Sequence, residues 1–465
     1  QSEQIVIVDT DGGKNQPDGS TNPNTTATID IVAINDDSGV SGSDFITNDK
    51  SLTYSGTVTG FTNNGDLVFV ELLDKTGSTV IAAAYVPATV TGTGPQSGTW
   101  TWTPTGAQTD GEYKIRATVV DVLGTRLNTT ATGQDTKDLA IDTSASTNQP
   151  GGSTDPNSAS NVSVAIGSID DGSSTSTAAT GSQDTGELKN DFITSDGTLT
   201  FSGTTANFSG AQGDKVHVQV FNDQGVAVVD QYVTPNATTG AWTFNNQGNT
   251  LPDGAYTIKA AIEDKAGNPV KVAANVPLII DSGSGTNVDP TDPVNPVKPD
   301  ANTTATVDIT SMTTDSGVSG SDYITNDTTL TYNGTVAGFT NNGDKVKLEL
   351  LAADGVTVVA TKYVVPTLSG TAPSAGTWSW AYETTQADGQ YTVRATIVDT
   401  ADNRVNSAAG GQDTQVVIVD SSASTNQPDD SVDPNNASTV TIAIGGIDDG
   451  DSTTTNATGS KDTGE

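Results

Sequence analysis

The sequence predicts an all-β protein in which two-sheet sandwiches follow one another along the chain. Apolar and polar residues alternate in short runs that Gly, Asn and Asp interrupt, a pattern typical of half-buried strands. The same landmarks return at a constant interval, as the spacing of Asp44 to Asp322 and the identical spacing of Trp100 to Trp378 show. Such a fixed interval indicates repeated modules.

Composition excludes several classes of partner. The 465 residues include 56 acidic and 19 basic side chains, which gives a formal net charge of −37. Binding to phosphates requires clustered Lys and Arg, so we expect neither nucleic acid nor an anionic membrane surface as a partner. The sequence contains no run of about 20 apolar residues, so direct membrane insertion is not expected. Charge repulsion of this strength is relieved by bound cations or by an extended arrangement of the charges.

The repeating unit is a pair of related modules, type A followed by type B. The borders between them are rich in Pro, Asn and Asp. We expect the last strand of a preceding module at 1–10, type A at 25–143, a linker at 144–160, type B at 161–282, a linker at 283–302, type A at 303–421, a linker at 422–437, and the start of an incomplete type B module at 438–465.

Each module is predicted to contain about seven strands. In the first module they are expected at 26–34, 52–60, 67–73, 80–86, 99–104, 112–121 and 137–142. An acidic loop at 35–51 separates the first two. Seven short strands within roughly 120 residues predict a two-sheet sandwich.

Aromatic residues recur at fixed places in this pattern. The tryptophans all fall in one strand of their modules, and two that are two residues apart share a face. We interpret them as core anchors, with a binding platform as the alternative. They are Trp100, Trp102, Trp242, Trp378 and Trp380. A tyrosine after "DG" precedes the penultimate strand (Tyr113, Tyr256 and Tyr391), like the tyrosine corner of immunoglobulin-like sandwiches.

The sequence predicts a protein that is not an enzyme and has no catalytic residues. His217 is the only histidine and there is no cysteine, so a nucleophile–His arrangement is not expected. We expect His217 to be a solvated, outward-facing residue of its strand. No segment interrupts the repeat in a way that would form a cleft for a pair of catalytic carboxylates. No phosphate-binding loop or zinc constellation is present.

Calcium is the cofactor that the acidic loops predict, since it takes six to eight oxygen ligands. In such a sandwich the opening loop and the exit of the last strand share one pole, and the loop after the penultimate strand lies at the other. Modules arranged end to end would place two acidic poles at each joint. The alternative is that Asp occupies these loops because it suits turns. The predicted ligands are Asp37, Asp44 and Asp142, then Asp184, Glu187, Asp191 and Asp281, then Asp315, Asp322 and Asp420, with Asp121, Asp264 and Asp399 at the opposite poles.

At "DSGVSGSDFITND", "TWTWTP", "DGEYKIRATVVD" and "LAIDTSAS" the chain resembles the tandem bacterial immunoglobulin-like repeats of giant, type I-secreted, biofilm-associated (Bap/RTX-like) adhesins. The resemblance covers nearly all of 25–281 and 303–465 except the linkers. It implies tandem immunoglobulin-like seven-stranded sandwiches in an extended string, located outside the cell at the bacterial surface or in the biofilm matrix. It implies calcium ions and neighbouring repeats as partners. The long linkers and "DVLGTRLN" in the first module depart from the family pattern.

The expected function is therefore a repetitive stalk segment that supports cell adhesion and biofilm formation, with calcium stiffening the modules and their joints. One alternative is direct recognition of a glycan, a host protein or a partner repeat, including adhesins or surface glycans of other cells. Phe69 is a candidate for this role, because the third module has Lys347 at the matching position. A second alternative is an accessory region of a secreted polysaccharide-degrading enzyme.

Overall fold

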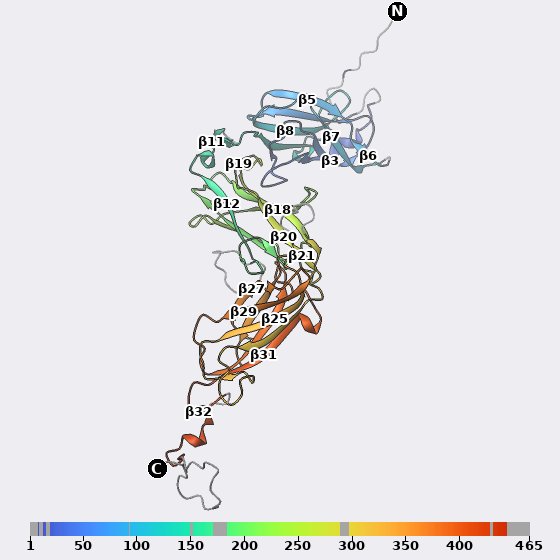
Figure 1. Ribbon diagram of the computed structural model, residues 1–465. Coiled ribbons are helices and arrows are strands. Elements are labelled where there is room, and N and C mark those ends of the chain that lie inside the picture. The colour runs from blue at the N-terminus through green and yellow to red at the C-terminus, as the bar shows by residue number, and fades with distance from the viewer. Residues whose placement is uncertain are drawn as a thin grey trace, which may run out of the picture. The chain divides into compact units, whose positions relative to one another are not determined.

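Three repeated sandwiches, each made of two β-sheets, form the fold (Figure 1). The computed structural model describes residues 8, 13–14, 19–92, 94–148, 152–170, 184–288, 297–427 and 431–443. Apart from Val8 and residues 438–443, the predicted terminal segments 1–10 and 438–465 lie outside the described residues.

The chain divides into two compact units. The first comprises Gln1–Ile280 and Thr291–Pro296, and the second comprises Asp281–Pro290 and Val297–Glu465. Every described element is a strand or a short 3₁₀ helix (η), which confirms the predicted all-β class. No helix in the described part of the chain is long and apolar enough to cross a membrane.

Module one contains a four-stranded sheet in the order β1-β3-β7-β6 and a five-stranded sheet in the order β2-β9-β8-β4-β5. The seven predicted strands are present, and two additional strands, β2 and β6, have two residues each. The pairing of β2 with β9 is parallel. The elements are η1 (Pro23–Thr26), β1 (Thr28–Ile34), β2 (Ile46–Thr47), β3 (Tyr54–Phe61), β4 (Leu67–Asp74), β5 (Val80–Val86), β6 (Thr89–Val90), β7 (Gln96–Trp102), β8 (Gly111–Val120), η2 (Ala131–Gly133) and β9 (Gln134–Ile141).

Module two has the sheets β12-β14-β17 and β13-β20-β18-β15-β16, and β19 also pairs with β18. Its elements are β12 (Ser163–Asp170), β13 (Ile193–Thr194), β14 (Thr200–Ala206), β15 (Lys215–Asn222), β16 (Ala227–Val233), β17 (Ala241–Asn245), β18 (Gly254–Glu263), β19 (Pro269–Val272) and β20 (Val276–Ile280).

Module three repeats the arrangement of module one, with sheets β23-β25-β29-β28 and β24-β31-β30-β26-β27. Its elements are β23 (Thr306–Met312), β24 (Ile324–Thr325), β25 (Thr331–Phe339), β26 (Lys345–Leu351), β27 (Val358–Val364), β28 (Thr367–Leu368), β29 (Ser374–Ala381), β30 (Gly389–Val398), η4 (Ala409–Gly411) and β31 (Gln412–Val419).

The segments expected as linkers contain secondary structure of their own. Each one has a pair of short antiparallel strands, and two of them continue into a 3₁₀ helix. The elements are β10 (Thr147–Asn148), β11 (Ser153–Thr154) and η3 (Pro156–Ser158), then β21 (Thr286–Val288) and β22 (Val297–Pro299), then β32 (Thr425–Asn426), β33 (Ser431–Val432) and η5 (Pro434–Asn436).

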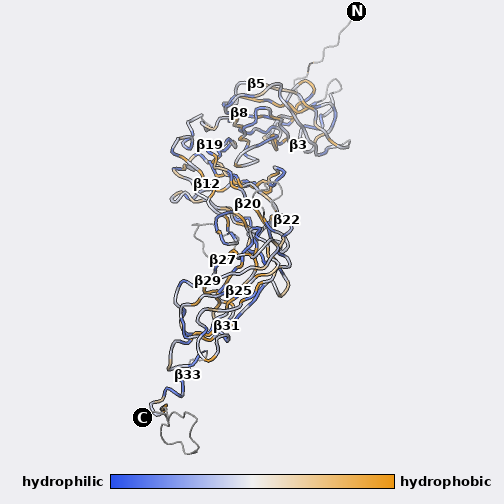
Figure 2. Tube along the Cα trace, viewed as in Figure 1, coloured by the Kyte–Doolittle hydropathy of each residue, from blue (hydrophilic) through white to orange (hydrophobic). Residues whose placement is uncertain are grey.

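The tryptophans lie in the cores, as predicted, and their positions depend on glycine. Figure 2 shows hydrophobic residues distributed along the strands of each module. Trp100 is 2% exposed and pairs across the sheet with Gly56 of β3. A Cβ atom at Gly56 would lie 2.5 Å from Trp100 Cε2. The indole therefore occupies space that only glycine leaves free, and module three repeats this pair as Gly334 and Trp378.

The three tyrosines after "DG" form the predicted corners. The Tyr113 hydroxyl donates to the backbone carbonyl of Thr109 at 2.7 Å. Tyr256 donates to the carbonyl four residues earlier at 2.7 Å, and Tyr391 does the same at 3.1 Å. Each hydroxyl thus fixes the turn that leads into the penultimate strand.

Replacing Gly56 by alanine should destabilise module one by about 1–3 kcal/mol, because the added methyl overpacks the core against Trp100. Denaturant unfolding followed by tryptophan fluorescence would measure the loss. Gly94→Ala is the matched control in the same module, since no atom lies within 4 Å of a Cβ at that position. Equal stability of the two variants would contradict the prediction.

Candidate functional site

The recurring acidic loop holds an aromatic residue in an unusual backbone conformation. Phe45 has φ 62°, a value that is uncommon for non-glycine residues. Its N–H donates to Asp37 Oδ2 at 3.0 Å. Asp315 and Tyr323 repeat this bond at 3.0 Å in module three. Asp184 accepts in the same way from Phe192 of module two, at 2.7 Å.

The acid directly before the aromatic residue forms a turn. Asp44 Oδ1 accepts the N–H of Ile46 at 3.1 Å, and Asp191 and Asp322 make the same bond two residues ahead at 3.1 and 3.2 Å. This local bond is an Asx turn, and it leads into the strand that pairs in parallel with the end of the module. Calcium binding by these three acids stays a prediction. The predicted ligand Glu187 is exposed.

The acids at the exit of the last strand are placed by the same loop. Asp142 donates its backbone N–H to the Thr47 carbonyl at 2.9 Å, and Asp420 donates to Thr325 at 2.8 Å. Asp142 is 1% exposed. Asp37, Asp44 and Asp142 therefore belong to one pole of module one, as the sequence predicted.

Within the first unit, this pole of module one contacts the loop after β18 of module two. The Ser38 hydroxyl donates to the Ala266 carbonyl at 2.6 Å, and the Asn268 amide donates to the Asp142 carbonyl at 2.8 Å. Gly39 lies so close that a Cβ there would be 2.1 Å from a backbone oxygen of that loop. The joint between these modules is thus a direct contact of two poles.

Asp264 organises the loop at this joint. Its Oδ1 accepts the backbone N–H of Asn268 at 2.9 Å and its Oδ2 accepts the Asn268 amide, also at 2.9 Å. Burial raises the pKa of Asp264 to about 6, and the nearby Asp142 carboxylate adds to the shift. A buried carboxylate is therefore held in place by one asparagine, which also contacts module one.

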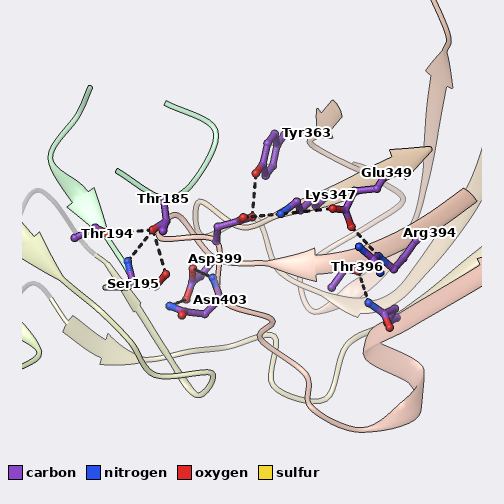
Figure 3. A network of polar contacts seen from close by, with 12 residues as sticks. Thr185, Thr194, Ser195, Lys347, Glu349, Tyr363, Arg394, Thr396, Asp399 and Asn403 are labelled. Carbon is purple, nitrogen blue, oxygen red and sulfur yellow. Dashed lines mark hydrogen bonds and ion pairs between the residues drawn. The ribbon is translucent and has the colours of Figure 1, made fainter. Parts of the chain in front are cut away.

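Module three has the same loop within the second unit, where Asp399 and Asn403 are seen in Figure 3. Asp399 accepts the backbone N–H and the amide of Asn403, both at 2.8 Å. The Asn403 amide also donates to the carbonyl of Asp281, at 2.7 Å. Burial raises the pKa of Asp399 to about 7, and Asp281 adds to the shift.

A buried carboxylate pair, which sequence analysis did not identify, lies beside Asp264. Asp155 precedes η3 and is 1% exposed, while Asp214 precedes β15 and is 2% exposed. Asn157 donates its N–H to Asp155 Oδ1 and its amide to Asp214 Oδ2, both at 2.6 Å. Asp155 Oδ2 and Asp214 Oδ1 are buried and have no hydrogen-bond partner. Burial, followed by the Asp155 and Asp264 carboxylates, raises the pKa of Asp214 to about 7.

The second unit contains the equivalent pair, Asp300 and Asp344. The amides of Asn287 and Asn302 donate to Asp344 at 2.6 and 2.7 Å. Asp300 accepts the backbone N–H of Asn302 through Oδ1, and its buried Oδ2 has no partner. Burial, with Asp300 and Asp399 nearby, raises the pKa of Asp344 to about 8. We call Asp155–Asp214 and Asp300–Asp344 the carboxylate pairs.

Module one differs at this pole. Asn22 stands where the other modules have Asp155 and Asp300, and its amide donates to Asp66 Oδ2 at 2.8 Å. The amide of Asn24 donates to the same oxygen at 2.8 Å. Asp121, the counterpart of Asp264, has a buried Oδ2 without a partner, because module one has Thr125 at the position of Asn268.

The carboxylate pairs fit a hard cation such as calcium. Among the described residues, no three His, Cys, Asp or Glu side chains converge into a ready-made metal-binding group. A cation would therefore use the two carboxylates together with carbonyl, amide or water oxygens, all of which calcium accepts. The unpartnered buried oxygens are the observation that favours it, since an uncompensated buried charge is strongly unfavourable.

The sequence patterns that predict linkers at residues 144–160 and 283–302 do not reveal the pairs. One signal was available: "DPN" occurs at 155–157 and again at 433–435, the same interval at which the modules repeat. Asp433 accepts the N–H of Asn435 at 2.8 Å, which repeats the Asp155–Asn157 bond.

Comparison with known proteins agrees with this architecture. Residues 24–143, 171–282 and 302–420 match the family described as bacterial Ig-like domain, and these spans cover more than half of the chain. The chain belongs to this family. No curated protein sequence matches it significantly.

The Ig-like modules are also similar to several solved structures at low identity. The FN1-FN3 domains of chicken CNTN1 match with 10% identity over 84% of this chain and 98% of that one, at a TM-score of 0.26. The BSP domain of a biofilm associated protein matches with 12% identity over 89% and 69%, at 0.16. Salmonella alpha-2-macroglobulin reacted with methylamine matches with 10% identity over 85% and 23%, at 0.20. TM-scores this low carry no argument about function.

The histidine of the second Ig-like module is not solvated, in contrast to the expectation. The His217 side chain is 11% exposed. Its Nδ1 lies 3.0 Å from Glu263 Oε1, and its Nε2 contacts Asp230. Tyr232 stacks on the ring at 4.2 Å and donates its hydroxyl to Glu263 at 2.7 Å. Burial by itself would lower the His217 pKa, but the two carboxylates outweigh it and raise the pKa.

The stability that His217 gives to its module should therefore depend on pH. A raised pKa in the folded state means that the contribution is complete below the unfolded value of about 6.5 and is lost as pH rises through the higher folded value. We expect the difference in unfolding free energy between wild type and His217→Gln to be larger at about pH 6 than at about pH 9. Denaturant titrations at both pH values measure it, and a difference independent of pH would contradict the assignment.

Proposed function

We propose that the chain is a non-catalytic segment of repeats from a bacterial surface adhesin, acting outside the cell as a stalk, with calcium stiffening its joints. The family assignment supports the role of a repeated Ig-like module. Support for cell adhesion and biofilm formation, type I secretion, and location at the cell surface or in the biofilm matrix are parts of this proposal. The observation that carries the calcium component is the Asp155–Asp214 pair, with its two buried, unpartnered oxygens.

The position of this pair connects a cation to the joint. The charge of Asp264 contributes to the raised pKa of Asp214. Asp264 in turn lies close enough to Asp142 of module one for their charges to interact. Asn268 links the same Asp264 carboxylate to the Asp142 carbonyl. A divalent cation at the pair would therefore compensate acids that belong to both modules.

The expected energies are sufficient for this role. Extracellular calcium sites have dissociation constants of about 10⁻⁴–10⁻³ M. At about 1 mM calcium, a site of about 10⁻⁴ M stabilises its module by roughly 1.4 kcal/mol. The formal net charge of −37 works in the same direction, because bound cations reduce the repulsion within the folded state.

Calcium should raise the thermal unfolding temperature of the chain relative to chelator. It should also make the particle stiffer, as seen by small-angle scattering. Asp214→Asn should reduce this calcium response, because one of the two carboxylates with an unpartnered oxygen is then neutral. Asp223→Asn, which changes an exposed acid of the same module, is the matched control and should retain the full response.

Identical unfolding curves and scattering profiles in calcium and in chelator would reject the calcium component. The acids would then act as turn residues and as hydrogen-bond acceptors within each module. The proposed stalk would remain a string of Ig-like modules without a calcium-dependent stiffness.

Direct recognition is a second candidate, favoured by one feature of module one. Phe69 and Tyr85 stack with ring centroids 4.5 Å apart, and Tyr85 is 53% exposed. Module three keeps the tyrosine as Tyr363 but has Lys347 in place of Phe69 (Figure 3). Lys347 donates to Asp402 at 2.6 Å, and the Tyr363 hydroxyl donates to the same carboxylate at 3.0 Å. A stacked pair with one exposed ring suits contact with a sugar.

Glycan screening of wild type and Phe69→Lys tests this candidate. Recognition through the stacked pair predicts a bound glycan whose affinity falls about fivefold or more in the variant, because losing a ring contact of about 1 kcal/mol raises a dissociation constant by that factor. Lys362→Ala of module three, which alters a half-exposed residue, is the control. Absence of any bound glycan, or equal binding by Phe69→Lys, would contradict it.

A further inference from the structure

Three equivalent positions in the segments before the modules are occupied by Asn in module one and by Asp in modules two and three. Asn22 and Asp300 occupy the same position of the type A repeat, and so do their partners Asp66 and Asp344. Asp155 has the same place in module two, because it contacts Asp214 and caps the 3₁₀ helix that precedes the first strand. The chain thus provides one amide and two carboxylates in otherwise matching surroundings.

The surroundings match in detail. An asparagine two residues further on donates its amide to the second acid in every module: Asn24 to Asp66 at 2.8 Å, Asn157 to Asp214 at 2.6 Å and Asn302 to Asp344 at 2.7 Å. The first residue accepts the backbone N–H of that asparagine in all three modules. The fold of the turn is therefore the same whether Asn or Asp occupies the first position.

The second polar side-chain atom of Asn22, Asp155 or Asp300 determines whether the charge of the neighbouring acid is balanced. In module one it is the Asn22 amide nitrogen, which donates to Asp66 Oδ2 at 2.8 Å. In the other two modules it is a carboxylate oxygen, Asp155 Oδ2 or Asp300 Oδ2, and both are buried without a partner. An amide brings its own donor, whereas two facing carboxylates need a proton or a cation between them.

We propose that this single position decides which turns before the modules depend on a divalent cation: Asn22 balances Asp66 of module one without a cation, whereas Asp155 and Asp300 make the carboxylate pairs of modules two and three depend on calcium. The inference rests on the proposed calcium function and specifies where it acts. Calcium affinity rises with the number of charged ligands. The pole of module one has two acids, Asp66 and Asp121, and each of the other poles has one more.

Removal of calcium would then act selectively along the chain. Modules two and three would loosen around their carboxylate pairs, while Asn22 and Asn24 of module one would keep their hydrogen bonds to Asp66. A stalk built this way would contain stiff and calcium-sensitive modules in a defined order. Asn or Asp at one position in the segment before each module would determine whether that module depends on calcium.

The test compares hydrogen exchange of the full chain in calcium and in chelator, resolved by module. In wild type, chelator should speed exchange at 153–162 and 214–218, and at 298–307 and 344–348. Exchange at 20–28 and 62–68 should not change. Asp155→Asn should abolish the response of module two and leave that of module three, and Asp300→Asn should do the reverse.

Calcium stoichiometry by equilibrium dialysis gives a second measurement. Asp155→Asn and Asp300→Asn should each lower the number of bound calcium ions by one. Both variants should stay folded, because Asn22 shows that the turn accepts an amide. Asn22→Asp, the reverse substitution, should make the module one segments respond to chelator and should add one bound ion.

Two results would overturn the inference, and they are distinguishable. If wild type binds calcium but Asp155→Asn and Asp300→Asn respond as wild type does, the inference fails and the calcium function stands. If wild type binds no calcium and shows no difference in exchange, both fail, and a shared proton balances the carboxylate pairs. A response of the module one segments in wild type would also overturn it.

Discussion

The compensation of buried carboxylates is the constraint on which the ends of these modules depend. Asp155, Asp214 and Asp264 are all at most 2% exposed, and like charges at such positions repel strongly in a medium of low polarity. Asparagine amides and backbone N–H groups meet part of this demand. The rest must come from a cation or from protons.

The sandwich itself supplies the positions of these acids. Each acid lies next to a strand end: Asp142 follows β9, Asp155 follows β11, Asp214 precedes β15 and Asp264 follows β18. Strands that are fixed by a close-packed core therefore hold the carboxylates near one another. The Trp–Gly pairs across the sheet and the tyrosine corners contribute to that core and its turns, so stability of the core is a condition for the geometry of the poles.

Differences between equivalent modules locate the features that are specific to one of them. Modules one and three share a Glu–Arg ion pair in their five-stranded sheets, Glu71 with Arg116 and Glu349 with Arg394, both at 2.7 Å. They differ at the aromatic pair of module one and at the residue before η1. The ion pairs are common to both modules, whereas the substitutions change the chemistry of the surface and of the pole.

The sequence by itself determined the fold class, the repeat and the strands, because alternation and turn residues are local properties that each strand displays. It also indicated the Trp anchors and the tyrosine corners, since both recur at fixed spacing. Only the tertiary structure decided that Asp155 and Asp214 form a pair, since they lie far apart in the sequence and their contact depends on how the linker folds back onto the module. The environment of His217 was decided in the same way, because its carboxylate neighbours, Asp230 and Glu263, come from the adjacent strands β16 and β18.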